Sequence, residues 1–453
     1  MIIILLTCLA GTYFAFKKRI NAFLFLFLFS LFLMPLTLFL FEAAWFQFKG
    51  YVPIYLTGIL FLCNANDLFF SDIFKKNLSS FSCIIFFLFV ALTISTAINN
   101  YSLINALAFF KNYFWPFLLY ITIVSLGYTN LNIRKYIAIF VIMQIGMAII
   151  QYLGGDSFSR SFYFDSWIKG DEIVTVSKSI TTSKGVLITG TLGKVTNLGI
   201  ILAICITYLF GSKTAHGEKN TTFDHIIIAA AVLVVIFTGV RAALMTCIIG
   251  LLLNFVFISG SLNKSLRRIC VILLFAIITL PVLVGIGADA IRSNADYSNT
   301  LHRSLSLFGV LGEIFGDDSA SHLYTLRRSV NISQFLNIKT FFFGSGIYTT
   351  DVKGYGPGIH SISDAQLLFT IVEFGIFTLI VCVLPHLYCL KDINRYCDKP
   401  VFKLSCILFV VIFLQTVVDA GMFFDVSSFL VFLLYANEGL IINEESLEQR
   451  TQV

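Results

Sequence analysis

The sequence predicts an all-α polytopic membrane protein with about 11–13 transmembrane helices. Three observations predict this class. Of the 453 residues, 58% are hydrophobic and only 12% are charged, about half the charged fraction of a soluble domain. The mean hydropathy is +0.89. Apolar runs of about twenty residues, the length that crosses a bilayer, recur along the whole chain.

Thirteen apolar runs predict the transmembrane helices, and residues 1–453 are expected to form a single integral membrane domain. The first, eighth and last runs are short, so half-helices or tilted helices are the alternative for them. Basic residues follow the first run, the reverse of a cleavable signal peptide, so we expect a first transmembrane helix. The runs cover residues 2–16, 20–41, 51–66, 81–98, 105–127, 135–153, 186–210, 225–238, 241–258, 269–287, 363–389, 402–421 and 427–442.

The distribution of Lys and Arg predicts the orientation, because cytoplasmic connections carry an excess of these residues. One set of alternate connections holds 17 of them, whereas the short connections of the other set hold Lys49, Lys111 and Arg241. We therefore expect the first set and the C-terminus to face the cytoplasm and the N-terminus to lie outside. The first set comprises Lys17, Lys18, Arg19, Lys75, Lys76, Arg134, Lys135, Lys213, Lys219, Lys264, Arg267, Arg268, Lys391, Arg395, Lys399, Lys403 and Arg450.

Two long polar loops, residues 154–186 and 288–362, face outward in this topology. The aromatic residues of the first loop predict anchoring at the membrane interface, with stacking on sugar rings as the alternative. The second loop is too long for a simple connection, and its apolar residues predict a packed, partly helical cap. We expect the function to reside here.

Several function classes lack support in the sequence. The net charge of +6 follows from the topology, and no nucleic-acid-binding motif accompanies it. There is no P-loop, HExxH, GxSxG or paired Cys/His spacing, so neither ATP-driven transport nor zinc hydrolysis is supported. None of the ten cysteines falls in the two long loops. We expect no cofactor and no metal.

His360 and Asp364 stand four residues apart where the second long loop meets an apolar run. If the helix begins near Ile362, both lie on one face. A carboxylate beside an imidazole raises its basicity, which suits a general base. The alternative is a helix N-cap formed by a serine or by Asp364, with His360 merely flanking it.

Arg241, between two apolar runs at the outer boundary, is a candidate because charge at that depth is costly. Snorkelling to the interface is its alternative. Lys194 lies near the start of the apolar run that follows the first long loop and is a candidate for binding substrate. The alternative is an ordinary lysine at the membrane interface. Glu373 lies inside a predicted span, about three turns below His360.

Four arginines of the second long loop are candidates for binding phosphate, namely Arg292, Arg303, Arg327 and Arg328. The planar guanidinium group donates two parallel hydrogen bonds to a phosphate, which lysine does not. The alternatives are a solvated loop face or attraction to anionic lipid headgroups.

Three segments together resemble the O-antigen polymerase/ligase superfamily, which includes the Wzy-type polymerases and the O-antigen ligases. They are residues 190–197 (GTLGKVTN), residues 238–244 (TGVRAAL), and residues 343–346 (FGSG) followed by residues 360–377. The resemblance spans roughly residues 186–390 and rests on the order, sides and spacing of these segments. Before residue 186 only the hydropathy agrees.

This resemblance implies a metal-independent, inverting glycosyltransferase with a helical, GT-C-like membrane fold in the bacterial inner membrane. Such enzymes act at the periplasmic face on oligosaccharides linked to undecaprenyl pyrophosphate. Arg241 and the pair Arg327 and Arg328 would hold the pyrophosphate, and His360 or Asp364 would orient or deprotonate the acceptor hydroxyl. A flippase and a chain-length regulator of the same pathway are the implied protein partners, beside membrane lipid.

Departures from the family pattern leave open whether His360 or Asp364 occupies the position of the family's histidine. Family members often have a His with an acidic residue about nine positions on, and here Asp364, not His360, stands nine before Glu373. A polymerase is the leading interpretation. An O-antigen ligase, acting on the lipid A core, and a lipid-linked oligosaccharide flippase are the alternatives. The long outward loop argues against the flippase, since a transporter that works by a rocking motion depends more on charges at the membrane midplane than on an external cap.

Overall fold

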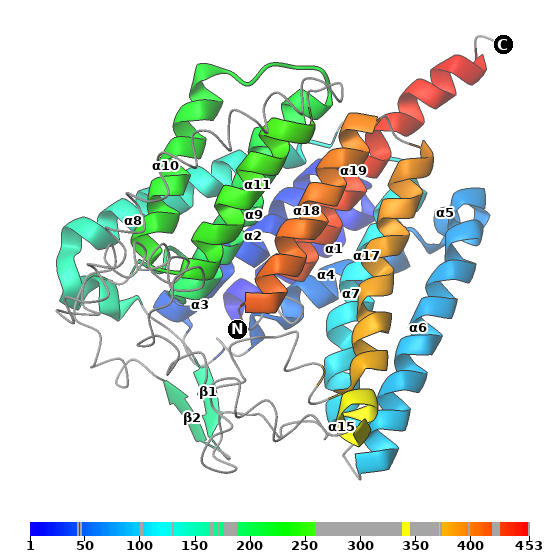
Figure 1. Cartoon of the computed structure of the whole chain (residues 1–453), viewed down its shortest axis with the longest axis horizontal. Coiled ribbons are helices and arrows are strands. Elements are labelled where there is room, and N and C mark those ends of the chain that lie inside the picture. The colour runs from blue at the N-terminus through cyan, green and yellow to red at the C-terminus, as the bar shows by residue number, and fades with distance from the viewer. Residues whose placement is uncertain are drawn as a thin grey trace, which may run out of the picture.

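The computed structural model describes a bundle of helices built from most of the chain (Figure 1). It describes residues 1–42, 45, 48–99, 103–128, 131–162, 166–169, 172–175, 186, 188–258, 338–344, 371, 374–396, 399–418 and 426–451.

Helices dominate this part of the chain, and one antiparallel hairpin accompanies them. The helices are α1 (Ile2–Phe16), α2 (Ile20–Phe32), α3 (Met34–Phe41), α4 (Tyr51–Cys63), α5 (Ala65–Phe70), α6 (Asp72–Asn99), α7 (Leu103–Leu126), α8 (Ile133–Ser161), α9 (Val195–Ala215), α10 (Thr222–Thr238), α11 (Arg241–Phe257), α15 (Ile338–Phe343), α17 (Ile376–Tyr396), α18 (Lys399–Val418) and α19 (Val426–Thr451). The hairpin pairs β1 (Ser166–Lys169) with β2 (Glu172–Thr175).

The coarse prediction of a helical multi-pass membrane protein is confirmed. Within the described ranges, five helices are long and apolar enough to cross a membrane, and α2 with α3 makes a sixth if the bent pair is one span. Further apolar helices of 10–17 residues, among them α1, α4 and α10, lie beside them. The predicted run 269–287 lies outside the described residues.

Helix α9 is the centre of one half of the bundle. It contacts α8, α10, α11 and α18, and it is apolar on all sides, as expected for a helix enclosed by others. The Asn254 side chain of α11 donates a hydrogen bond to the Thr207 carbonyl of α9 at 3.0 Å. Gln415 of α18 donates to the Thr246 hydroxyl of α11 at 3.0 Å. Such bonds between apolar helices fix their register.

Helices α6, α7, α17 and α19 form the other half, with α6 at its edge (Figure 1). Polar side chains also tie these helices together. The Tyr388 hydroxyl of α17 donates to the Asn77 amide oxygen of α6 at 2.7 Å, and the Tyr120 hydroxyl of α7 donates to Asp392 of α17 at 3.1 Å. Helix α17 is therefore held on two sides.

The run predicted over residues 20–41 is not one straight helix, because α2 and α3 are separate helices bent by 61° at a break. Pro35 stands in the first turn of α3. Proline lacks the N–H group that would continue the hydrogen-bond ladder of α2, and its ring clashes with the preceding turn. The residues on both sides of the break are apolar, so the hydropathy of the sequence does not reveal the break.

Three further boundaries differ from the prediction. In the run 186–210 the helix begins only at Val195, because Gly190 and Gly193 adopt positive φ angles of 56° and 78°. In the run 363–389 helix α17 begins at Ile376, after Gly375 with φ of 85°. The first long loop is not wholly irregular either: α8 is interrupted at Gly155 (φ of 76°), close to the predicted end of its run, a further helical segment then reaches Ser161, and the hairpin follows as a small departure from an all-α fold.

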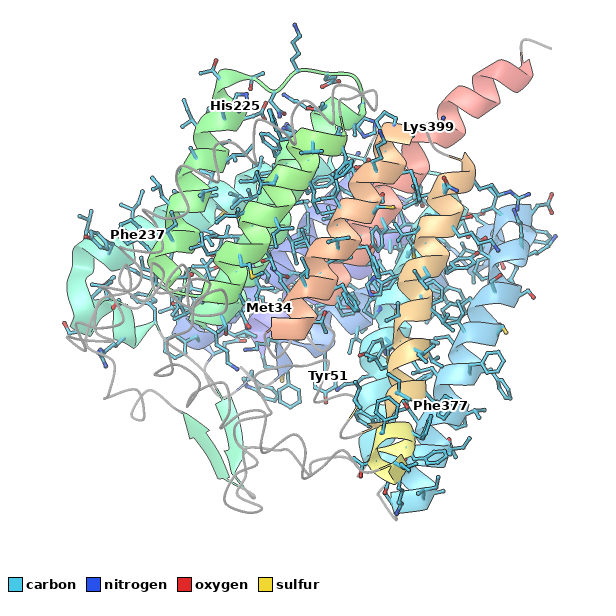
Figure 2. The ribbon with its side chains drawn as sticks, in the orientation of Figure 1. Met34, Tyr51, His225, Phe237, Phe377 and Lys399 are labelled. Carbon is cyan, nitrogen blue, oxygen red and sulfur yellow. The ribbon has the colours of Figure 1, made fainter. Side chains whose placement is uncertain are left out.

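The described basic residues of the larger predicted set gather at one end of the bundle, here called the cationic end. It comprises the C-terminal ends of α1, α9 and α17 and the N-terminal ends of α8, α10 and α18, and Figure 2 shows His225 and Lys399 there. Asp224 binds Arg134 at 2.7 Å and Lys213 at 2.8 Å, which joins α8, α9 and α10. Lys18 pairs with Asp67 beside them. The geometry therefore agrees with the grouping on which the predicted orientation rests.

Candidate functional site

Seven of the predicted site residues lie outside the described residues, and two lie within them. Those outside are His360, Asp364, Glu373, Arg292, Arg303, Arg327 and Arg328. Lys194 is described completely, and Arg241 is described by its backbone, as the first residue of α11.

Lys194 and Arg241 both stand where helices begin, at the end of the bundle opposite to the cationic end. This end, here called the loop end, comprises residues 189–194, Val240, Gly344 and Gly375. The starts of α9 and α11 lie side by side, since a Cβ atom placed on Gly199 would be 3.3 Å from Val240 Cβ. The structure thus brings two of the three segments that carry the family resemblance to neighbouring helix starts.

A buried, non-helical turn over residues 189–193, here called the clamped turn, leads into Lys194. Gln151 of α8 binds its first two residues with all of its polar atoms. The side-chain oxygen accepts from the N–H groups of Thr189 at 2.9 Å and Gly190 at 3.0 Å. The side-chain nitrogen donates to the Thr189 hydroxyl at 3.0 Å and the Gly190 carbonyl at 3.1 Å. These bonds satisfy backbone groups that a helix would otherwise have paired.

Gln144, two turns earlier on α8, binds the next residue of the clamped turn. Its oxygen accepts from the Thr191 N–H group at 2.9 Å, and its nitrogen donates to the Thr191 hydroxyl. That hydroxyl donates in turn to the carbonyl of Phe32, the last residue of α2. Both glutamines are fully buried. The clamped turn is thereby joined to the break between α2 and α3.

Gly190 is required at its position in this turn. Its φ of 56° lies in the left-handed region, and a Cβ atom there would be 2.3 Å from the Gln144 side-chain oxygen. Any side chain would therefore strain the backbone and displace the glutamine. Lys194 follows in extended conformation, half-buried, as the residue that precedes α9.

A second junction at the loop end joins α15 to the start of α17. A Cβ atom on Gly375 would be 2.1 Å from the Phe342 carbonyl oxygen, so the two backbones are in direct contact. The ring of Phe342 stacks on that of Phe377 with centroids 5.5 Å apart. Figure 2 shows Phe377 at this end of the bundle.

The end of α6 holds the same junction from the other side. Ser95 donates to the Phe343 carbonyl at 2.7 Å, and the Asn99 amide donates to the Gly344 carbonyl at 3.1 Å. The described chain stops at Gly344 and resumes at Ile371, whose carbonyl accepts from the Gly375 N–H group at 2.8 Å. The segment that contains His360 and Asp364 therefore starts and finishes at one anchored place.

Other charged groups fix the loop end. The Met1 ammonium and the backbone N–H groups of Ile2 and Ile3 donate to Glu42, and these bonds hold the pKa of that carboxyl below its usual range. The Lys111 ammonium lies 4.5 Å from the centroid of the Tyr51 ring. These contacts tie the N-terminus to the end of α3 and tie α7 to the start of α4.

The predicted site residues do not include the two glutamines or the pair Ser95 and Asn99. A signal for the first pair existed, because Gln144 and Gln151 are isolated amides seven residues apart in an apolar run and so share a face of the helix. Ser95 and Asn99 are four apart on α6 and also share a face.

Chemically, the described part of the loop end offers a half-buried lysine directly after the clamped turn, beside the start of a second helix that begins with arginine. This arrangement suits an anionic group arriving at the membrane surface. Comparison of the sequence with family models gave no match, and comparison with curated proteins gave none.

Proposed function

We propose that this protein is a polymerase of the bacterial inner membrane that joins oligosaccharide repeat units linked to undecaprenyl pyrophosphate into an O-antigen or capsule-like polysaccharide. It acts as a metal-independent, inverting glycosyltransferase with a GT-C-like architecture. The cationic end faces the cytoplasm, and the loop end faces the periplasm.

The observation that supports the proposal is that the described parts of the resembling segments lie at one end of the bundle, the loop end. Residues 190–194, the start of α11 at Arg241, and the junction of Gly344 with Gly375 all lie there. The described cations of the larger set lie at the other end, as the positive-inside tendency requires for a periplasmic loop end.

In the proposed reaction, an acceptor hydroxyl oxygen attacks the anomeric carbon of the donor's reducing-end sugar. The bond from that carbon to the pyrophosphate oxygen breaks, and undecaprenyl pyrophosphate leaves with the bonding electrons. His360 or Asp364 takes the hydroxyl proton. Arg241, Arg327 and Arg328 stabilise the charge on the leaving group, because guanidinium groups bind phosphate oxygens bidentately. Lys194, Arg303 and Glu373 complete the binding of the substrate.

A strain that lacks this protein distinguishes the candidate functions. We expect its surface lipopolysaccharide to carry core with a single repeat unit, with the ladder of longer chains restored by complementation. Gel electrophoresis of both strains measures this. Bare core would contradict a polymerase: with lipid-linked polymer accumulating in the membrane it would identify the ligase, and without that polymer the flippase.

Arg241 gives a prediction at the level of one residue. We expect Arg241→Ala to lower turnover by roughly 100-fold or more, the cost of losing one preorganised donor to developing charge. Arg241→Lys should also be impaired, because an ammonium group cannot bind phosphate bidentately. Turnover is measured with purified protein and lipid-linked substrate.

Lys111→Ala is the matched control, since Lys111 is a cation of the same end that rests on the Tyr51 ring. Its turnover should stay unchanged. Full activity of Arg241→Ala would remove Arg241 from the mechanism, and full activity of Arg241→Lys alone would favour snorkelling at the interface.

A further inference from the structure

Two interruptions of helical structure meet inside the bundle, at the break between α2 and α3 and at the clamped turn. They are joined by the hydrogen bond from the Thr191 hydroxyl to the Phe32 carbonyl. Non-helical backbone within a membrane is tolerated only where protein buries it or where it lines a cavity. In secondary transporters, discontinuous helices form the sites for substrates and ions.

A continuous helix through residues 189–194 would satisfy its own backbone. The chain instead uses two buried glutamines for that purpose, and every polar atom of both is engaged with the clamped turn. Burying these amides is tolerated because they are fully paired. What the turn achieves is the placement of Lys194, extended and half-buried, directly before α9.

We infer that Gln144 and Gln151 are positioning residues that hold the Lys194 ammonium at the loop end for the pyrophosphate of the lipid-linked substrate. Gln151 fixes the start of the turn, and Gln144 fixes Thr191 and, through it, the end of α2. The inference rests on the proposed function for the identity of the ligand. The positioning itself rests on the hydrogen bonds.

The first test measures how accessible residue 194 is to a reagent in solution, and it requires no assay of enzymatic activity. In a Lys194→Cys variant, a membrane-impermeant maleimide labels the new thiol, and the protein with Lys194 intact gives the background of native cysteines. Adding Gln151→Met, which keeps the side-chain volume but removes the hydrogen bonds, should raise the labelling rate at least about fivefold, the effect of losing one net hydrogen bond.

Asn254→Leu in the same Lys194→Cys background is the matched control. Asn254 is a buried amide that binds the Thr207 carbonyl of α9, away from the clamped turn, so its loss weakens the bundle without releasing Lys194. An unchanged labelling rate with Gln151→Met, or an equal rise with Asn254→Leu, would overturn the inference.

The second test is a double-mutant cycle on the affinity for purified undecaprenyl pyrophosphate. Gln151→Met should weaken binding about tenfold when Lys194 is present and should have no further effect in Lys194→Ala, because coupled residues are not additive. Additive losses would overturn the positioning role. If labelling changes but no variant or parent binds this lipid, the positioning role stands and the proposed function fails.

Where Gln151→Met lowers the yield of monomeric protein, Thr189→Val takes its place in both tests. This change keeps the shape of a side chain that is fully buried, and it removes the bond that its hydroxyl accepts from Gln151 together with those that it donates to the carbonyls of Phe162 and Gly190. The expected shifts have the same direction and are smaller, and their absence in correctly folded protein overturns the inference.

Discussion

Replacing Gly375 by alanine is expected to destabilise the protein by about 2–5 kcal/mol, the largest single effect on the fold that the structure indicates. A residue other than glycine at φ of 85° is strained, which costs roughly 1–2 kcal/mol. The new Cβ atom would also stand 2.1 Å from the Phe342 carbonyl oxygen. Since the backbone fixes the Cβ position and the oxygen is itself a backbone atom, neither can rotate away, and α15 must separate from α17.

The thermal midpoint in detergent measures this effect, together with the monomeric fraction on size-exclusion chromatography. Gly146→Ala is the matched control: Gly146 lies inside α8, and a Cβ atom there would meet nothing within 4 Å. We expect that change to be neutral or slightly stabilising, since alanine is the better helix former. Equal thermal midpoints for Gly375→Ala and the parent protein would show that the junction does not stabilise the fold.

His360→Ala and Asp364→Ala are expected to differ sharply in their effect on turnover. Loss of a general base typically costs 10²–10⁴-fold, so one of the two variants should fall by roughly that factor. The larger loss identifies the residue that activates the acceptor hydroxyl. It also decides which of the two residues occupies the position of the family's histidine. Turnover per mole of correctly inserted protein is the measurement.

The same pair tests the helix-cap alternative. Removing a capping residue costs about 1 kcal/mol of stability and leaves the chemistry intact. A lowered thermal midpoint with full turnover in Asp364→Ala would therefore assign Asp364 to a cap. If neither variant loses turnover, the assignment of the site to this loop fails as a whole.

The fold class and most helices could be predicted from the sequence because the length needed to cross a membrane is recorded in apolar runs. The helix breaks could not be located from hydropathy, since residues on both sides of Pro35 are equally apolar. The late start of α9 depends on the φ angles of Gly190 and Gly193, and glycine permits those angles without requiring them.

The site was predicted in part. Lys194 does precede a helix and Arg241 does begin one, as the alternation of polar and apolar segments indicates. Their roles, and those of the residues between 292 and 373, stay predictions. The roles of the glutamines were not predicted because their partners are distant in sequence. Gln151 binds Thr189, 38 positions later, and Gln144 binds Thr191, 47 positions later. Local patterns do not record such pairings.

The bond between Thr191 and Phe32 joins residues 159 positions apart, and this separation has a consequence for biosynthesis. At about 5–20 residues per second, the ribosome needs roughly 10–30 s after α2 is made before Thr191 exists. During that interval the freed carbonyl at the end of α2 must be hydrated or bound by another group. The tie between the break that Pro35 causes and the clamped turn is therefore made only after residues 186–210 have been synthesised.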